Sequence, residues 1–345
     1  MVAYHIWDQL ASSKPLSDIS GVRIKPADFF FPMPVEQDED QRDKMIEIMA
    51  SGVRGFRHDE NIIHERGINK SYGAVDAYEH LAPVIDTDTC MAFLKDLVAS
   101  KGAKLITRTI KGDLFDQEQP LRAEFQADAI INATGLSGSE VAGDKSCYPI
   151  RGVLIRVIND GTDFPKLDQA LTISADVAGE IVFLVPRNDG ILLIGGITEP
   201  NQHALDLTLD SPIVKRMRAR CEEFLPDLKK ARLDPDYPLA QGLRPFRQRN
   251  IRVERELRFQ ELGAGSERKL VPSRIVHNYG HGGAGWSLSF GCAADVLALV
   301  EEALLDLPPR AMRVDAGEPK VPQSVPVSTK VPAEQDLDLH VKARL

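Results

Sequence analysis

The stretch from Arg274 to Leu304 constrains the fold of this chain more than any other. A short apolar run, Ile275 and Val276, leads into a loop with four glycines in six positions, Gly280 to Gly285. The residues that follow carry apolar side chains at a helical spacing. A strand, a glycine loop and a helix start bring backbone close to a ligand, because glycine has no side chain and the first N–H groups of a helix are unpaired.

The loop Gly280–Gly285 also matches the G-x-G-x-x-G spacing of a dinucleotide phosphate loop. That function requires a second strand after the helix, ending in an acidic residue that binds the ribose. Here the helix leads into a proline-rich segment, so we expect the match to be false. Two alternatives stay open: a tight glycine turn without a ligand, and a helix start that faces another electron-rich group, such as a ring carbonyl.

Composition narrows the class of protein. With 345 residues, of which 43% are apolar, we expect one or two domains with a substantial core. The net charge of −9 argues against nucleic acid or an anionic membrane as a partner. We expect no membrane span, because no apolar run approaches the length needed, and no metal site, because the four cysteines are far apart.

Local patterns predict a mixed α/β fold. A helix at residues 89–100 and strands at 104–110 and 127–133 indicate part of a parallel sheet. Strands at 152–157, 180–185 and 190–194 predict an antiparallel meander. We also expect helices at 4–11, 36–49 and 212–224, an apolar loop at 29–31, a short strand at 82–86, a turn at 240–247 and a flexible tail at 308–345.

Two further motifs carry chemistry. In Gly242-Leu243-Arg244-Pro245, a guanidinium stands beside a residue of fixed φ, which suits bidentate recognition of a carboxylate. The commoner alternative is an ion-paired or surface arginine. Thr134 and Gly135 follow an apolar strand, and small residues there permit close approach of a cofactor.

These motifs, in this order, resemble the D-amino-acid oxidase family of FAD-dependent oxidoreductases. The resemblance covers roughly residues 1–305. Its most specific piece is the run from His277 to Gly283. The other matching pieces are Ile131-Asn132-Ala133-Thr134-Gly135, Arg151-Gly152, Gly195-Gly196-Ile197, Gly242-Leu243-Arg244-Pro245 with Arg247, Arg252-Val253-Glu254-Arg255-Glu256 and Gly291-Cys292-Ala293.

The resemblance implies two domains and a set of site residues. An FAD-binding parallel-sheet domain would take residues 1–150 and 242–307, and an antiparallel-sheet substrate domain would take 151–241. The reaction would be oxidative deamination of D-amino acids: a hydride passes from the substrate α-carbon to the flavin, and O2 becomes H2O2. No acid–base side chain is required if the amine arrives neutral. Arg244, Phe183 and Gly283 would bind the substrate, and Ile110, Thr134, Gly135, Gly283, Gly285, Trp286 and Ser287 would bind FAD.

Two departures from the family define the alternatives. Family members begin with a strand, a G-x-G-x-x-G loop and an acidic ribose ligand, and we expect this chain to start downstream of them, so that its FAD-binding domain is N-terminally incomplete. Phe183 stands where the amino-acid oxidases place a tyrosine. The second hypothesis is therefore a truncated or inactive relative that does not hold FAD tightly. A nicotinamide enzyme using residues 280–285 ranks third.

The last three residues, Ala343-Arg344-Leu345, resemble a variant of the Ser-Lys-Leu peroxisomal address. They predict an import receptor as a partner and the peroxisome as the location, with the cytoplasm as the alternative. The sequence leaves open which amino acid is oxidised and what the oligomeric state is.

Overall fold

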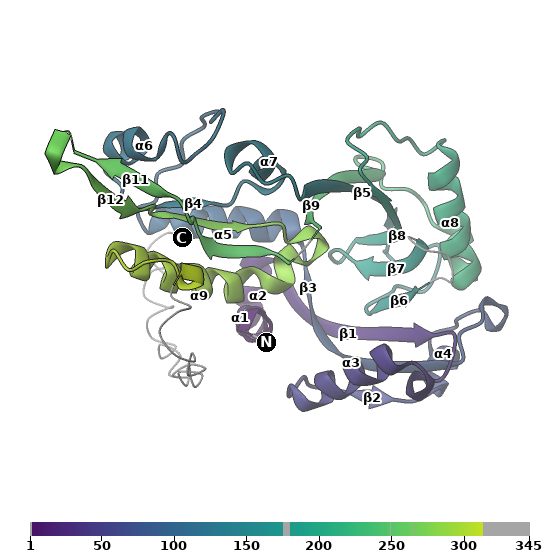
Figure 1. Cartoon of the computed structure of the whole chain (residues 1–345). Helices are drawn as coiled ribbons and strands as arrows, with labels where there is room; N and C mark the ends of the chain where they lie inside the picture. Colours follow the sequence, from purple (N-terminus) through teal and green to yellow (C-terminus); the bar gives the residue numbers. More distant parts are fainter. Residues whose placement is uncertain (1, 175–179, 249, 264, 313–345) are drawn as a thin grey trace.

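The computed structural model describes residues 2–174, 180–248, 250–263 and 265–312, and within these residues it contains a large sheet, a small sheet and a two-stranded sheet of β11 and β12 (Figure 1). Eight strands form the large sheet in the order β2-β3-β1-β6-β7-β8-β5-β9. All neighbours are antiparallel except β1 and β6. The strands are β1 (Val22–Phe31), β2 (Arg57–His58), β3 (Asp76–Ile85), β5 (Cys147–Ile158), β6 (Ala170–Ser174), β7 (Glu180–Pro186), β8 (Ile191–Pro200) and β9 (Leu239–Arg247).

The predicted antiparallel meander is confirmed in β5, β7 and β8, but the sheet that contains it is larger than expected. Strands β1 and β3 come from the predicted FAD-binding range 1–150, and β9 crosses the predicted boundary at residue 241. The domain boundaries stay predictions. Hydrogen bonding between strands nevertheless joins segments from both sides of them.

Helix α8 (Pro212–Phe224) covers one face of the large sheet (Figure 1). It has the bounds that the sequence predicts, because a proline starts it and its apolar residues recur at helical spacing. Its buried side chains Val214, Met217, Cys221 and Phe224 pack with strand residues such as Val153 and Val182 in the main core. Helix α3 (Glu39–Ala50) packs over Phe31 and Tyr78, on the opposite face of β1 and β3.

The small sheet has the order β10-β13-β4, with β10 (Arg252–Arg255), β13 (Ile275–Tyr279) and β4 (Ile130–Asn132). Strands β13 and β4 are parallel, whereas β10 and β13 are antiparallel. Helix α9 (Gly285–Leu304) lies against β10, β13 and α1 (Val2–Leu10). By length and composition alone, the 23 residues Gly282–Leu304 could cross a membrane, contrary to the expectation from the sequence, and 11% of their most apolar window is buried.

The remaining elements connect the two sheets or cover them. Asp86 caps α5 by accepting a hydrogen bond from the Asp88 N–H. The other elements are α2 (Lys14–Ser20), α4 (Asn61–Glu65), α5 (Thr87–Ser100), α6 (Glu118–Phe125), α7 (Gly138–Val141), β11 (Phe259–Leu262), β12 (Lys269–Pro272) and the 3-10 helices η1 (Val35–Gln37), η2 (Lys70–Tyr72), η3 (Gly135–Ser137), η4 (Pro226–Lys230), η5 (Gly265–Glu267), η6 (Gly282–Ala284) and η7 (Arg310–Met312).

Three local predictions are wrong. Residues 29–31 form the end of β1, because they pair with β3 along its full length. Residues 240–247 belong to β9, where pairing with β5 overrides the turn signal of glycine and proline. Residues 104–110 form no strand, and no described segment pairs with them; Leu105 and Ile106 are 60% and 62% exposed. A strand needs a neighbour for its N–H and C=O groups. Of the predicted tail, residues 313–345 lie outside the described part.

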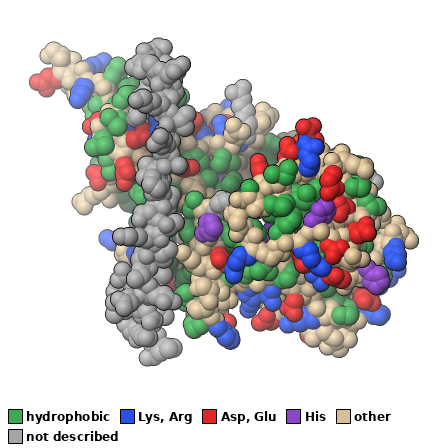
Figure 2. Space-filling view, turned by 90° about the horizontal axis from the view of Figure 1, so that it is seen from below, with side chains coloured by type: hydrophobic (Ala, Val, Ile, Leu, Met, Phe, Trp, Pro, Cys, Tyr) green, Lys and Arg blue, Asp and Glu red, His purple; other side chains and the backbone are tan. Residues whose placement is uncertain are grey.

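The surface seen from below mixes charges of both signs. On this face Asp and Glu side chains alternate with Lys and Arg side chains, and apolar side chains lie among them (Figure 2). Such a surface attracts a polyanion weakly.

Candidate active site

The glycine loop leads from β13 into an uncapped helix. Gly280 and Gly282 have positive φ angles of 87° and 57°, which a side chain would strain. In the described part of the chain, no side chain caps the start of α9, and Gly283 is exposed there. No side chain of the described residues therefore occupies the first N–H groups of this 20-residue helix, and its positive dipole end favours a negatively charged or electron-rich group.

Strand β9 packs directly against this loop. A Cβ atom built on Gly282 would lie 2.6 Å from the ring of Phe246, and one on Gly280 would lie 3.0 Å from Cδ of Arg247. A Cβ on Gly135 would lie 3.4 Å from Cβ of Pro245. Consecutive residues of β9 thus occupy the space that the glycines leave, and they join the two sheets.

Arg244 precedes these residues on β9 and is half-buried. Its guanidinium lies over Gly152, since a Cβ there would come within 2.1 Å of Nη1. Nη1 donates a 3.4 Å hydrogen bond to the Ile197 carbonyl oxygen. Burial lowers the pKa of Arg244, and no carboxylate of the described residues pairs with it. Gly283 contacts the same side chain, with 3.6 Å from its built Cβ to Cδ of Arg244. A half-buried cation without a carboxylate partner is suited to bind an anion.

Phe183 lies on the same face of the large sheet as Arg244. Its neighbours Val182 and Leu184 point into the core beneath α8, so Phe183 points to the opposite face. Val153, beside Gly152, points into the same core, which places the guanidinium of Arg244 on the face of Phe183. Strands β8 and β5 lie between the two residues.

The predicted cofactor residues fall into two groups. Thr134 and Ser287 are exposed, at the ends of β4 and the loop. The Trp286 ring instead packs on Trp7, with centroids 5.6 Å apart, and its carbonyl oxygen accepts the Trp7 Nε1–H. Ile110 packs with Ile130 at the start of β4, whereas Thr134 follows its end. The side chain of Ile110 is therefore not brought to Thr134, and a role for its backbone stays a prediction.

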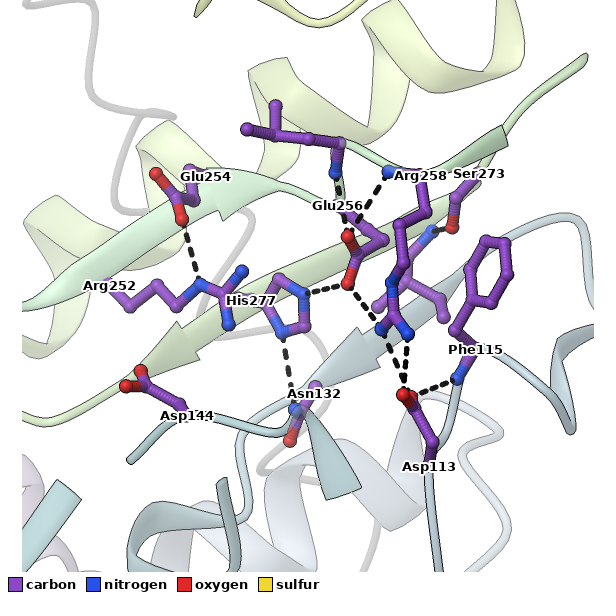
Figure 3. A network of polar contacts seen from close by, with 12 residues as sticks. Asp113, Phe115, Asn132, Asp144, Arg252, Glu254, Glu256, Arg258, Ser273 and His277 are labelled. Carbon is purple, nitrogen blue, oxygen red and sulfur yellow. Dashed lines mark hydrogen bonds and ion pairs between the residues drawn. The ribbon is translucent and has the colours of Figure 1, made fainter. Parts of the chain in front are cut away.

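A network of polar side chains beside this loop escaped the sequence reasoning (Figure 3). Asn132 and His277 are joined at 3.2 Å, and His277 Nε2 lies 3.3 Å from Glu256. Glu256 also pairs with Arg258, which pairs with Asp113. Asn132 and His277 lie in two of the motifs that carry the family resemblance, but nothing in the sequence indicates that their two strands are neighbours. The signal that could have found them is polar residues inside otherwise apolar strands.

A second network ties β9 to β13. Asp144 accepts hydrogen bonds from Arg247 Nε at 2.7 Å and from the Tyr279 hydroxyl at 3.0 Å. Burial alone would raise the pKa of Asp144, but hydrogen bonds from Ser146, Tyr279 and Arg247 outweigh it and hold this pKa well below its usual range. Asp144 therefore stays ionised and anchors Arg247 next to Gly280.

One group of possible metal ligands lies elsewhere, at the edge of the large sheet. Single ligand atoms of Glu36, His58 and Asp76 lie within 4.8 Å of one another. The His58 Nε2 is 2.9 Å from Asp76, so the ring already has a partner. The prediction that the protein has no metal site stays a prediction.

Comparison with known proteins assigns the family. The model of the FAD dependent oxidoreductase family matches residues 31–299. The chain belongs to this family of FAD-dependent oxidoreductases. A D-amino-acid oxidase of Rubrobacter xylanophilus is 32% identical over 232 residues, which cover 67% of this chain and 62% of that protein. A D-amino-acid oxidase of Streptomyces coelicolor is 30% identical over 267 residues, which cover 72% and 73%. The chain thus spans less than two thirds of the Rubrobacter protein.

Solved structures of other enzymes share the fold. Glycine oxidase from Geobacillus kaustophilus superposes with a TM-score of 0.61 at 19% identity, covering 87% of this chain and 77% of that one. L-proline dehydrogenase from P. horikoshii superposes with a TM-score of 0.59 at 15% identity, covering 87% and 76%. These identities confirm the predicted mixed α/β oxidase fold and nothing finer.

The family's cofactor is FAD, and the described residues fit its ring. The N-terminus of α9 has no side-chain cap in the described chain and offers N–H donors and a positive dipole end, and Gly283 is exposed beside it. The loop Gly280–Gly285 does not have the context of a phosphate loop, because α9 is followed by η7 and no described strand comes after it. The false match stays a prediction.

Proposed function

We propose that this chain is an FAD-dependent oxidase of D-amino acids. The observation that carries the proposal is Arg244, a half-buried guanidinium without a carboxylate partner among the described residues, placed against Gly283 at the start of α9. An amino acid offers a carboxylate to such a fork and holds its α-carbon a short, fixed distance away. The names of both relatives support the D-amino acid as the substrate class.

Each part of the site has one task. Bound FAD supplies a two-electron acceptor, and O2 is the proposed final acceptor, giving H2O2. Arg244 would bind the substrate carboxylate and orient the α-carbon. The positive end of α9 would stabilise negative charge that develops beside it. Phe183 would line the pocket with an apolar ring and no hydroxyl, so the carboxylate would depend on Arg244 more heavily.

Spectroscopy of the purified chain tests this function. After addition of FAD we expect flavin absorbance that persists through gel filtration and is bleached, without oxygen, by D-alanine but not by L-alanine. Glycine and L-proline are tested in parallel, because solved proteins of the same fold carry those substrates in their names. Bleaching by either alone would replace the proposed substrate class.

Substitution of Arg244 tests its role. We expect Arg244→Ala to lower kcat/KM by roughly a hundredfold or more through a higher KM, because an unpaired carboxylate would be left in the pocket. Arg244→Lys keeps the charge but loses the planar fork, so its kcat/KM should lie between those of the unaltered chain and Arg244→Ala. The matched control is Arg156→Ala on β5, since Arg156 is ion-paired with Asp234 at 2.8 Å. An unchanged KM in Arg244→Ala would refute the assignment.

One observation favours the second hypothesis, a relative that does not hold FAD tightly. Ile131 of β4 is 53% exposed, and the described neighbours of β4 lie on one side only. Such an edge is an incomplete support for a large cofactor. A protein that stays colourless after addition of FAD would establish this alternative.

A further inference from the structure

The end of β4 is held by a contact between two fully buried polar side chains. Asn132 and His277 are register partners on the parallel strands β4 and β13. Each is 1% exposed. Their side chains therefore meet on one face of the small sheet, with Nδ2 of Asn132 3.2 Å from Nδ1 of His277 (Figure 3).

The amide of Asn132 can point in only one direction. Its Oδ1 accepts two hydrogen bonds from Thr134, one from the backbone N–H at 3.2 Å and one from the hydroxyl at 2.8 Å. The NH2 group must then face His277 and donate to Nδ1. A ring nitrogen that accepts carries no proton, so the proton of the neutral ring sits on Nε2.

The Nε2–H has a matching acceptor. Glu256 Oε2 lies 3.3 Å from it, and the carboxylate is 5% exposed. Glu256 also accepts from Arg258 Nη2 at 2.9 Å and from the Leu257 N–H at 2.8 Å. Every donor from Thr134 to His277 thus points the same way, and an ionised carboxylate terminates the chain. Reversing one member would place two donors or two acceptors face to face.

We propose that His277, as a neutral ring protonated on Nε2, is a positioning residue for the turn Thr134–Gly135. Its acceptor nitrogen fixes the amide of Asn132, and that amide fixes both donors of Thr134. Gly135 packs on Pro245, the residue after Arg244, so the same turn also supports the strand that carries the substrate arginine. The link from this turn to FAD rests on the proposed function; the link from His277 to Thr134 does not.

The first experiment reads the tautomer directly. A long-range ¹H–¹⁵N correlation spectrum of the full chain distinguishes protonated from unprotonated ring nitrogens, and the signal missing from His277→Gln assigns His277. At neutral pH we expect an unprotonated Nδ1 and a protonated Nε2. A ring protonated on Nδ1, or on both nitrogens, would overturn the proposal whether or not FAD binds.

The second experiment compares two amides at this position. His277→Asn places its amide near Nδ1 and can still meet Asn132, whereas His277→Gln places its amide near Nε2 and meets only Glu256. We expect hydrogen exchange of the Thr134 amide to accelerate about tenfold in the Gln variant, the loss of one typical hydrogen bond. The Asn variant should stay within about threefold of the unaltered chain.

The control is Asn278→Ala on the same strand, because the Asn278 Oδ1 has no hydrogen-bond partner in the described chain. This variant should leave the exchange of Thr134 unchanged. If the Asn and Gln variants accelerate exchange equally, His277 is only structural and the proposal is wrong.

Binding of FAD gives the functional readout. Titration followed by flavin fluorescence should show a Kd about tenfold higher in His277→Gln than in His277→Asn. Equal Kd values would overturn the role of the turn in the site. If the unaltered chain takes up no FAD, the proposed function fails, while the tautomer and the exchange of Thr134 still decide the positioning role.

Discussion

Beneath α8 the large sheet buries an almost wholly apolar face, whereas the small sheet buries a chain of polar groups that bond in one direction. The first includes Val153, Val182 and Phe224, each 0% exposed. The second includes Asn132, His277 and Glu256, each at most 5% exposed. The free energy of apolar burial is roughly proportional to buried area and does not depend on direction. A buried polar group is costly unless each of its hydrogen-bond partners is in place. The comparison teaches that buried apolar area stabilises the large sheet, whereas directional hydrogen bonds stabilise the small sheet beside the candidate site.

Removing apolar volume from the large sheet should have the largest effect. Phe224 packs on Phe30 and Tyr72, with ring centroids 5.5 and 5.1 Å away. We expect Phe224→Ala to lower the free energy of unfolding by about 3–5 kcal/mol, measured by urea denaturation. As a control, Leu297 on α9 is 61% exposed, so Leu297→Ala should change the free energy of unfolding by about 0.5 kcal/mol or less. Equal losses would show that α9 is covered in solution.

The glycine loop should respond to a single methyl group. At Gly282, φ is 57° and a Cβ would lie 2.6 Å from Phe246, so Gly282→Ala should cost about 1–3 kcal/mol and displace the start of α9. Gly291 lies inside α9 with open space around its built Cβ. Gly291→Ala should therefore stabilise the protein by about 0.5–1 kcal/mol. Thermal unfolding of both variants measures these changes. A stability change of the same sign in both variants would refute the close packing of the glycine loop on Phe246.

Acid should shift the two sheets in opposite directions. Burial, with Glu79 nearby, raises the pKa of Asp28 on β1 to about 6 despite its pairing with Arg66. The folded chain then binds this proton more readily than the unfolded chain, so stability rises as pH falls from about 6 to about 4. Burial lowers the pKa of His277, against the raising effect of Glu256. The unfolded chain then binds this proton more readily than the folded chain. The stability that neutral His277 contributes is therefore lost as pH falls below about 6.5, the ordinary pKa of histidine.

Hydrogen exchange at pH 7, 6 and 5, corrected for intrinsic rates, measures both responses. Amides of β1 and β3 should become more protected by about two- to tenfold, and those of β4 and β13 less protected by a similar factor. Asp28→Asn should abolish the first response and His277→Gln the second. The ring of His277 also faces Arg252 and Glu254, whose charges oppose each other. Responses of equal sign in both sheets would contradict the comparison.

Features that depend on neighbours in the sequence could be predicted, and features that depend on distant partners could not. The bounds of α8 follow from its proline and its apolar spacing. In β9, by contrast, glycine and proline indicate a turn, and only pairing with β5 reveals a strand. As an edge strand, β9 tolerates Pro245, since the missing N–H does not interrupt a ladder on both sides.

The site divides in the same way. Arg244 and the glycines are recognisable because each motif is short and contiguous. The network is not, because Asp113 and Arg258 are 145 residues apart in the chain and meet only after folding. Trp286 shows a contact that its motif did not indicate, since its ring packs on Trp7; its contact with FAD stays a prediction.

The packing of β9 on the glycine loop should make the proposed site selective for the length of its substrate. Because Phe246 and Arg247 fill the spaces at Gly282 and Gly280, the guanidinium of Arg244 and the start of α9 cannot separate without losing these contacts. The guanidinium of Arg244, the proposed carboxylate ligand, and the start of α9 are therefore held at one distance from each other. A β-amino acid inserts an extra carbon between carboxylate and amine, which places a different atom at the reacting position. We expect turnover of D-alanine but not of β-alanine. Comparable rates would mean that the distance between Arg244 and the start of α9 is not fixed.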